Sequence, residues 1–216
     1  MEYHNQDLVD YVDQVANQIL AGKANDKYRD HFFPELINAM NLNIGVEVGV
    51  DTGKFTEHLL AKTNMNMVYG IDPWIDNFGS DFRPEYFDVN GNARYNEAAT
   101  RLLNYIPERC TLVQGFSVEA AQTFEDNSID FCYIDGDHSL EGIFNDLYTW
   151  IHKVRTGGII SGHDYKDGPN SGMPDFAGNQ LDYKIKTVVD NFCQQYGFKL
   201  NTVGGRILNW WFVKNA

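Results

Sequence analysis

The stretch of residues 44–60, IGVEVGVDTGKFTEHLL, constrains the fold more than any other part of the chain. An apolar run ends in Gly49, a turn of small residues extends to Gly53, and a helical pattern then begins. This order is typical of a β-strand, a tight turn and a helix. Glycine allows a turn to adopt dihedrals, or a close approach, that a Cβ atom would block, and the first N–H groups of the helix point towards the turn. We therefore expect a small molecule to bind at this turn.

The turn carries an acid at an informative position. Its spacing, Glu47-x-Gly49-x-x-x-Gly53, differs from the dinucleotide-binding pattern G-x-G-x-x-G, in which a glycine approaches the pyrophosphate. A carboxylate repels a diphosphate and attracts an ammonium or sulfonium group. The pattern therefore favours a cationic cofactor. The alternative is an ordinary strand-turn-helix unit in which Glu47 is paired within the protein.

Apolar runs and helical patterns alternate along the rest of the chain. We expect strands at residues 67–71, 110–114, 129–134 and 159–162, and helices at 54–62, 140–154 and 183–196. Ser117 is expected to be the N-cap of a further helix, Gly157-Gly158 to end the helix before the fifth strand, and residues 166–182 to form a loop. Two β-rich runs around Gly204-Gly205 predict a C-terminal antiparallel hairpin. The sequence thus predicts an α/β fold with a Rossmann-like, doubly wound, mostly parallel sheet.

The N-terminal segment has its own pattern. Residues 6–21 place their apolar side chains on one helical stripe, and a second helix is expected after Pro34, within residues 28–41. A length of 216 residues suits one α/β domain and hardly two. We expect a single domain, with residues 1–41 as a helical cap on a core formed by residues 42–216. The striped helix either covers a sheet edge or joins a dimer interface, so a homo-oligomer is left open.

Charge and composition narrow the range of partners. Seventeen basic and thirty acidic residues give a formal net charge of −13. Such a surface repels nucleic-acid backbones and anionic lipids, so we expect neither nucleic acid nor a membrane as a partner. The sequence shows neither a membrane-length apolar run nor a signal-peptide pattern, and we expect a cytoplasmic protein. Three scattered cysteines are expected to be buried free thiols: Cys110, Cys132 and Cys193.

Polar residues follow the expected strands at their carboxyl ends. Asp72 ends the second strand, where α/β nucleotide sites place the acceptor for the ribose hydroxyls; a turn-forming Asp-Pro is the alternative. The fourth strand runs into residues 135–139, DGDHS, and the fifth into residues 163–165, HDY. The carboxyl ends of parallel strands meet at one edge of a sheet, where ligands bind. We therefore expect these groups to share a site.

Structural roles compete with functional ones in these turns. Asp137 and Ser139 are as well suited to capping the next helix as to function, and His138 also suits a polar turn position. Asp135 and Asp164 are two carboxylates at neighbouring strand ends, an arrangement that is unfavourable without a nearby cation. This favours a functional role for that pair.

The assembled motifs resemble the class I S-adenosylmethionine-dependent methyltransferases over roughly residues 42–214. The motifs are VEVGVDTGKF, VYGIDPW, GFS, FCYIDGDHSLEGIFNDLYTW and GGIISGHDY, followed by the terminal hairpin. The chain is similar to the subgroup that includes macrolide-sugar O-methyltransferases and other small-molecule enzymes. The resemblance implies a seven-stranded sheet whose last strand is antiparallel.

The resemblance also implies a set of residues that hold S-adenosylmethionine: Glu47, Val48, Gly49, Gly53, Asp72, Trp74, Gly115, Ser117 and Asp135. Within this set, Glu47, Val48 and Gly49 would line the methionine end. Asp72 would bind the ribose hydroxyls, and Gly115 with Ser117 would border the adenine.

Methyl transfer requires an acceptor that is positioned and deprotonated. In metal-dependent relatives an acid after the fourth strand and two ligands after the fifth hold a divalent cation, and the matching residues are Asp135, His163 and Asp164. Hard oxygen ligands suit Mg²⁺, but His163 stands where relatives usually carry an acid, so either Mg²⁺ or another divalent cation is left open. Without a metal, His138 or His163 would be the general base. We predict His138 and Asp135 as catalytic residues.

The sequence therefore predicts an S-adenosylmethionine-dependent methyltransferase that acts on a hydroxyl group of a small molecule. Several aromatic side chains would suit either an acceptor with a sugar or aromatic ring or a lid packed on itself: Trp74, Phe78, Phe82, Tyr86 and Phe87. A catalytically inactive module with the same fold, which binds the cofactor or serves in assembly, is the alternative. A nicotinamide-dependent oxidoreductase is disfavoured because G-x-G-x-x-G does not follow the first strand.

Overall fold

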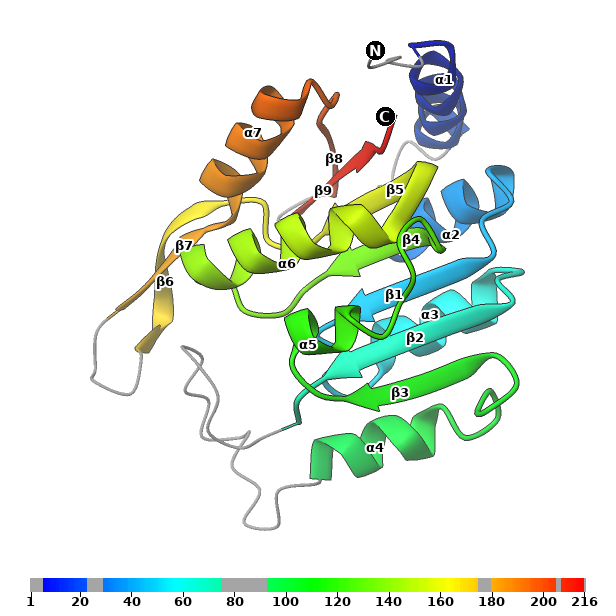
Figure 1. Ribbon diagram of the computed structural model, residues 1–216, viewed down its shortest axis with the longest axis vertical. Helices are drawn as coiled ribbons and strands as arrows, with labels where there is room; N and C mark the ends of the chain where they lie inside the picture. The colour runs from blue at the N-terminus through cyan, green and yellow to red at the C-terminus, as the bar shows by residue number, and fades with distance from the viewer. Residues whose placement is uncertain (1–5, 23–28, 75–92, 175–179, 205–206, 216) are drawn as a thin grey trace.

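A seven-stranded sheet lies at the centre of the computed structural model, which describes residues 6–22, 29–74, 93–174, 180–204 and 207–215 (Figure 1). The strand order is β3-β2-β1-β4-β5-β9-β8. Five strands are parallel: β1 Ile44–Val48, β2 Met67–Asp72, β3 Cys110–Gln114, β4 Ile129–Ile134 and β5 Val154–Gly162. Strand β9 Leu208–Val213 runs antiparallel to both of its neighbours, β5 and β8 Asn201–Gly204. The predicted Rossmann-like sheet and its C-terminal hairpin are confirmed.

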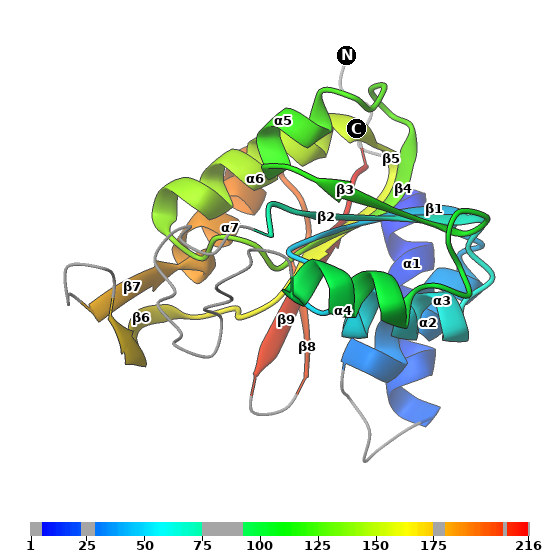
Figure 2. The ribbon, with the colours of Figure 1, turned by 90° about the horizontal axis from the view of Figure 1, so that it is seen from below.

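Helices cover both faces of the sheet (Figure 2). One face carries α1 Gln6–Gly22, α2 Arg29–Ala39, α3 Lys54–Lys62 and α4 Ala93–Arg101; the other carries α5 Ser117–Ala121, α6 Leu140–Lys153 and α7 Ile185–Tyr196. Successive strand residues point to opposite faces. Phe131 and Tyr133 of β4 accordingly join the core beneath α2 and α3, while Cys132 and Ile134 join the core beneath α6 and α7. The sheet is therefore buried on both sides.

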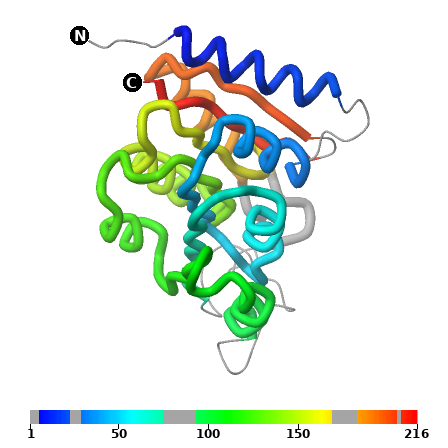
Figure 3. The backbone as a smooth tube through the Cα atoms, turned by 90° about the vertical axis from the view of Figure 1, so that its right-hand side faces the viewer, coloured from blue at the N-terminus to red at the C-terminus, as the bar shows by residue number. Residues whose placement is uncertain are grey.

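The N-terminal helix lies at the edge of the sheet. Figure 3 shows α1 running beside the C-terminal strands, and Asp13 of α1 forms an ion pair with Lys199, just before β8. Val12 and Ala16 of α1 are buried in the same core as Trp211 of β9. Of the two roles expected for this helix, covering a sheet edge is the one observed.

Helix α2 begins earlier than predicted. Its first residue is Arg29, so Pro34 lies inside the helix, and the prediction of a helix after Pro34 was wrong. A proline has no N–H to donate to the carbonyl four residues earlier. That carbonyl, of Asp30, is hydrogen bonded instead to Nε2 of His58 in α3. The contact from a neighbouring helix satisfies the group that proline leaves without a partner.

Residues 166–182 were predicted as a loop, and this was also wrong. Strands β6 Asp167–Pro174 and β7 Gln180–Lys184 form a separate antiparallel pair, with Asp167 opposite Lys184. The segment is rich in Gly, Pro, Asn and Asp, residues that are depleted in strands, and backbone pairing overrides that composition. Figure 1 shows this pair beyond the carboxyl ends of the parallel strands. Helix α7 consequently begins at Ile185.

Two further expectations have clear outcomes. Helix α6 ends at Lys153 and β5 starts directly at Val154, so Gly157 and Gly158 lie within the strand and do not end the helix. All three cysteines are buried free thiols, as predicted. Phe78, Phe82, Tyr86 and Phe87 lie outside the described residues. None of the helices in the described part of the chain is long and apolar enough to cross a membrane.

Candidate functional site

The turn after β1 is pressed against the end of β4. Gly49 has a φ of 88°, in the region that favours glycine, and its N–H donates to the Ile71 carbonyl at 2.8 Å. A Cβ atom at this position would overlap with the carbonyl oxygen of Asp135. The N–H of Asp135 in turn donates to the Val48 carbonyl at 2.8 Å. Gly53, with a φ of 77°, is the N-cap residue of α3. The glycines thus bring the predicted methionine-end residues next to Asp135.

Glu47 is buried at the end of β1, with 2 % of its surface exposed. Its carboxyl accepts a hydrogen bond from the Thr56 hydroxyl of α3. Burial raises the pKa of Glu47 to about 8, against the opposing effects of Thr56 and of the positive charge of Arg29. Pairing within the protein, the structural alternative for Glu47, is therefore observed. With this raised pKa, Glu47 is largely protonated at neutral pH. A cation bound beside it would lower the pKa and favour the ionised form.

Asp72 organises the turn after β2. Its carboxylate accepts hydrogen bonds from the backbone N–H of Asp51 at 2.9 Å and of Trp74 at 2.8 Å. Burial raises the pKa of Asp72 to about 6, and the backbone hydrogen bonds oppose the shift. The Trp74 side chain is buried, and its Nε1 donates to the Asp51 carbonyl at 2.8 Å. The turn-forming role of Asp72 is thus present. It also holds the β1 and β2 turns against each other.

The predicted adenine border differs from expectation. Helix α5 begins at Ser117 with Phe116 as its N-cap residue, so the prediction that Ser117 is the N-cap was wrong. The Ser117 hydroxyl instead accepts a hydrogen bond from Trp150 Nε1 of α6 at 2.8 Å, which ties the two helices together. At Gly115 a Cβ atom would have no heavy atom within 4 Å, so this position borders open space.

Asp135 is the centre of a charged cluster. Its Oδ1 lies 3.2 Å from His138 Nε2 and 3.5 Å from His163 Nδ1, and its Oδ2 lies 3.2 Å from Arg29 Nη1. Burial alone would raise the pKa of Asp135, but the hydrogen bond with His138 and the positive charges around it outweigh burial and lower that pKa. Burial lowers the pKa of His163, which favours its neutral form. The predicted residues after β4 and β5 therefore do meet.

Ser139 and Asp137 have structural contacts in the turn between β4 and α6. Ser139 is the N-cap of α6, and its hydroxyl accepts from the Gly142 N–H at 3.0 Å. Asp137 accepts from the Ser139 N–H at 2.9 Å. Helix capping, the structural alternative, is therefore observed for Ser139, and Asp137 holds this N-cap residue in place. His138, between them, contacts Asp135 and also the ring of Tyr183 in β7, with ring centroids 4.9 Å apart.

Sequence reasoning missed the residues on the other side of Asp135. Arg29 Nη1 also donates to the Tyr133 hydroxyl at 2.9 Å, and that hydroxyl donates to the buried Asn209 of β9 at 2.6 Å. The guanidinium lies over the Phe55 ring, 4.7 Å from its centroid. Arg29 precedes Asp135 by more than 100 residues and belongs to no motif. Arg29 is the first residue of α2, and only the folded structure shows that this position lies beside Asp135.

The residues predicted as metal ligands do not fit a metal ion as they are arranged. Asp164 Oδ1 lies 3.7 Å from His163 Nδ1 and 3.5 Å from Lys166 Nζ. Asp135 already faces the Arg29 guanidinium, a permanent cation that would repel a second one. Within the described parts of the chain, no group of three or more His, Cys, Asp or Glu side chains could hold a metal ion.

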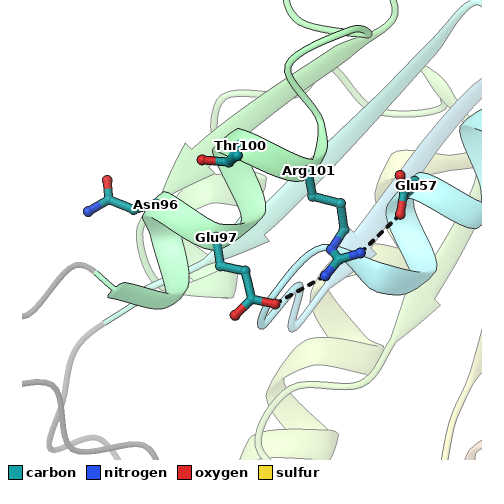
Figure 4. A pocket seen from close by; sticks show the side chains of 5 residues that line it. All are labelled: Glu57, Asn96, Glu97, Thr100 and Arg101. Carbon is teal, nitrogen blue, oxygen red and sulfur yellow. Dashed lines mark hydrogen bonds and ion pairs between the residues drawn. The ribbon is translucent and has the colours of Figure 1, made fainter.

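A surface pocket of about 430 Å³ lies between α3 and α4 (Figure 4). Its lining includes Arg101, whose guanidinium is 3.2 Å from Glu57 and 3.1 Å from Glu97. Arg101 Nε also donates to the Thr52 carbonyl at 2.9 Å. These contacts fix α4 against the start of α3, and none of the predicted site residues lines this pocket.

Comparisons with known proteins agree with this architecture. Residues 46–165, more than half of the chain, match the family model described as "Methyltransferase domain". Among solved structures, an O-methyltransferase from Bacillus cereus in complex with SAH is similar with a TM-score of 0.60 and 15% identity, covering 96% of this chain and 91% of that chain. A protein from Staphylococcus aureus provisionally assigned as a caffeoyl-CoA O-methyltransferase has a TM-score of 0.64 and 13% identity, covering 97% and 100%.

At such identities the structural likeness shows the fold alone. A search of curated proteins returned no match. These two neighbours do not single out macrolide-sugar enzymes, so that narrower likeness stays a prediction. The matching family model covers both the β1 turn and the ends of β4 and β5, where Asp135 and His163 meet. The chain therefore belongs to the methyltransferase domain family, with the fold of the class I S-adenosylmethionine-dependent methyltransferases.

Proposed function

We propose that this protein transfers the methyl group of S-adenosylmethionine to a hydroxyl oxygen of a small molecule. The observation that carries the proposal is the meeting of Glu47, Asp135 and His138 at the carboxyl ends of β1 and β4, in a chain that belongs to the methyltransferase domain family. The neighbours from Bacillus cereus and Staphylococcus aureus, both described as O-methyltransferases, support oxygen as the acceptor atom.

In this proposal the cofactor lies across the ends of β1, β2 and β3. Glu47, Val48 and Gly49 face its methionine end, with Gly53 and Asp135 beside them. Asp72 receives the ribose hydroxyls, while Trp74, Gly115 and Ser117 border the adenosine. The open space at Gly115 suits a flat ring, and the Ser117 side chain contributes by fixing α5.

The reaction needs little chemistry from the protein. The acceptor oxygen attacks the methyl carbon in line with the carbon–sulfur bond. That bond breaks, and its electron pair stays on sulfur, which leaves neutral S-adenosylhomocysteine. The hydroxyl proton passes to a general base, for which we propose His138. A hydrogen bond from Nε2–H to Asp135 leaves Nδ1 as the basic nitrogen and stabilises the imidazolium that forms. His138 Nδ1 is buried, so the acceptor reaches it only if neighbouring side chains move.

A divalent cation held by Asp135, His163 and Asp164 is the second candidate mechanism. Such an ion would lower the pKa of the acceptor hydroxyl. The guanidinium on Asp135 argues against it, and we route no step through a metal. If methyl transfer stops on treatment with a chelator and returns with Mg²⁺ or Mn²⁺, the metal mechanism is correct and ours is wrong. His163 would serve as base in place of His138 if only its substitution abolished turnover.

The proposal is tested by incubating the protein with S-adenosylmethionine and a panel of sugar and aromatic hydroxyl compounds, with methylated products detected by mass spectrometry. For an acceptor that is methylated, we expect His138→Gln to lower kcat by roughly 10²- to 10⁴-fold with little change in cofactor affinity. His152→Gln is the matched control. His152 lies in the last turn of α6, the helix that begins just after His138, and is remote from the site. Cofactor binding without any methylated product across a broad panel would favour the inactive-module alternative.

A further inference from the structure

Arg29 lies inside the candidate site although no motif contains it. Its guanidinium contacts Asp135 and Tyr133 and lies over two aromatic rings, Phe55 at 4.7 Å and Tyr133 at 5.6 Å. The side chain is 27 % exposed. Of the groups that contact Asp135, Arg29 alone carries a permanent charge, because a histidine is neutral over much of the physiological range.

The existing contacts do not use the full hydrogen-bonding capacity of Arg29. An arginine presents five N–H donors in a planar fork that matches a carboxylate in a bidentate pair. The contact with Asp135 uses one nitrogen, Nη1, at 3.2 Å, and Nη1 also bonds Tyr133. Nε contacts Asp30 at 3.3 Å, and Nη2 has no hydrogen bond to any residue that the structure describes. A second carboxylate can therefore be accommodated.

The methionine end of the proposed cofactor carries such a carboxylate. It is a zwitterion, with an ammonium group and a carboxylate on the same carbon. Glu47 and Asp135 account for the ammonium and the sulfonium, but they would repel the carboxylate. Arg29 lies close enough to Glu47 for its charge to lower the pKa of that acid, and it touches Asp135. Both signs of charge are thus present at one place.

We infer that Arg29 binds the α-carboxylate of the cofactor's methionine moiety, so that the N-terminal cap supplies part of the cofactor site. This inference rests on the proposed function, because it takes the methionine end to lie at the β1 turn. The aromatic rings hold the guanidinium in place before binding, which limits the entropy lost when the carboxylate is bound. Helix α2 thereby takes part in recognition of the cofactor.

A purely structural role is the competing explanation. In that case Arg29 would only join α2 to β4 through Asp135 and Tyr133. The two explanations differ in their dependence on the ligand's carboxylate, which can be removed chemically. The decarboxylated analogue of S-adenosylhomocysteine keeps the adenosine, the sulfur and the amine, and it lacks only that group.

The test is calorimetric titration of the full chain with S-adenosylhomocysteine and with its decarboxylated analogue. We expect Arg29→Gln to weaken binding of S-adenosylhomocysteine roughly 10- to 100-fold, as for loss of a charge-assisted hydrogen bond, and to leave binding of the analogue within about twofold. Arg29→Lys should retain part of the affinity. Arg155→Gln is the matched control, because Arg155 pairs with Asp130 at the amino end of β4, away from the site.

The outcomes separate the inference from the proposed function. If Arg29→Gln weakens both ligands equally, or neither, the inference is wrong while the proposed function stands. If the wild-type chain binds neither ligand, the proposed function is wrong and the inference falls with it. Should Arg29→Gln fail to fold, the inference is tested by Arg29→Lys and by the wild-type preference for S-adenosylhomocysteine. A wild-type protein that binds the analogue equally well contradicts it.

Discussion

Glu47 combines deep burial with a position at the end of the first strand. An acid whose pKa is raised on folding destabilises the folded state once the unfolded chain ionises. For Glu47, with an ordinary value of 4.5 and a folded pKa of about 8, the native state binds more protons than the unfolded state between these values. The contribution of Glu47 to the free energy of unfolding therefore falls as the pH rises from about 4.5 to 8. Outside that range its contribution does not change with pH.

Glu47→Gln removes this pH dependence. We expect the variant to gain stability relative to the wild type as the pH is raised from 5 to 8, by on the order of 3 kcal/mol. Urea unfolding of both proteins at the two pH values measures the difference. Asp126→Asn, at an exposed position, is a control that should not reproduce the trend. A stability difference that is independent of pH would mean that Glu47 is ionised in the folded protein.

Some residues of the candidate site could be predicted from the sequence and others could not. Glu47, Asp72, Asp135 and His163 could be predicted because each lies at, or directly after, the carboxyl end of a parallel strand, and parallel strands bring such positions to one edge. Arg29 could not, because its place depends on how α2 packs across the sheet. The cap prediction failed at Ser117 because residue type does not distinguish an N-cap from the first helical residue, and the indole of Trp150 competes for the hydroxyl.

The turn between β1 and α3 lies against the end of β4 in a close approach that only glycine permits. A side chain at Gly49 would both require an unfavourable positive φ and overlap with the backbone of Asp135. At Gly115, after β3, the same change meets no atom within 4 Å. The two glycines therefore provide a matched comparison of one substitution in two turns at the same edge of the sheet.

We expect Gly49→Ala to lower the free energy of unfolding by at least about 2 kcal/mol and to abolish cofactor binding, since β1 and β4 must separate. Gly115→Ala should unfold like the wild type, while its affinity for S-adenosylhomocysteine falls if the adenine lies against this turn. Thermal unfolding followed by calorimetric titration measures both quantities. Equal stability of Gly49→Ala and the wild type would contradict the described contact with Asp135.

Among the elements, the alternation of apolar runs with helical patterns predicted most of the sheet. It did not predict the β6–β7 pair. Strands β1 to β5 are apolar runs covered on both faces, which gives a strong signal. Strands β6 and β7 pair only with each other, so their sequence carries no core pattern. Local composition then indicates a loop. The early start of α2 was hidden for a related reason, because the contact from His58 that compensates for Pro34 comes from another helix.

In the molecule as a whole, the N-terminal cap and the sheet share one core. Phe33 of α2 is fully buried and its ring lies 5.7 Å from that of Phe131 and 5.6 Å from that of Tyr133, both in β4. This packing supports the proposal that residues 1–41 and 42–216 form a single domain. It also links the segment that carries Arg29 to the strand that leads into Asp135.

We expect Phe33→Ala to lower the free energy of unfolding by about 3–5 kcal/mol and to shift one cooperative transition of the whole chain. Phe144→Ala, at a half-exposed position on α6, is the control and should cost much less. Denaturation followed by both far-ultraviolet circular dichroism and tryptophan fluorescence distinguishes the cases. Two separate transitions, with only the first affected by Phe33→Ala, would show that the cap unfolds independently of the sheet.

We propose above all that the edge formed by the carboxyl ends of β1, β2, β3 and β4 binds S-adenosylmethionine. Calorimetric titration of the wild-type chain with S-adenosylhomocysteine and, separately, with NAD⁺ tests it most directly. We expect saturable binding of one S-adenosylhomocysteine per chain, with a dissociation constant between about 1 μM and 1 mM, and no binding of NAD⁺ in that range. Absence of heat from S-adenosylhomocysteine at about 1 mM, or tighter binding of NAD⁺, would contradict it.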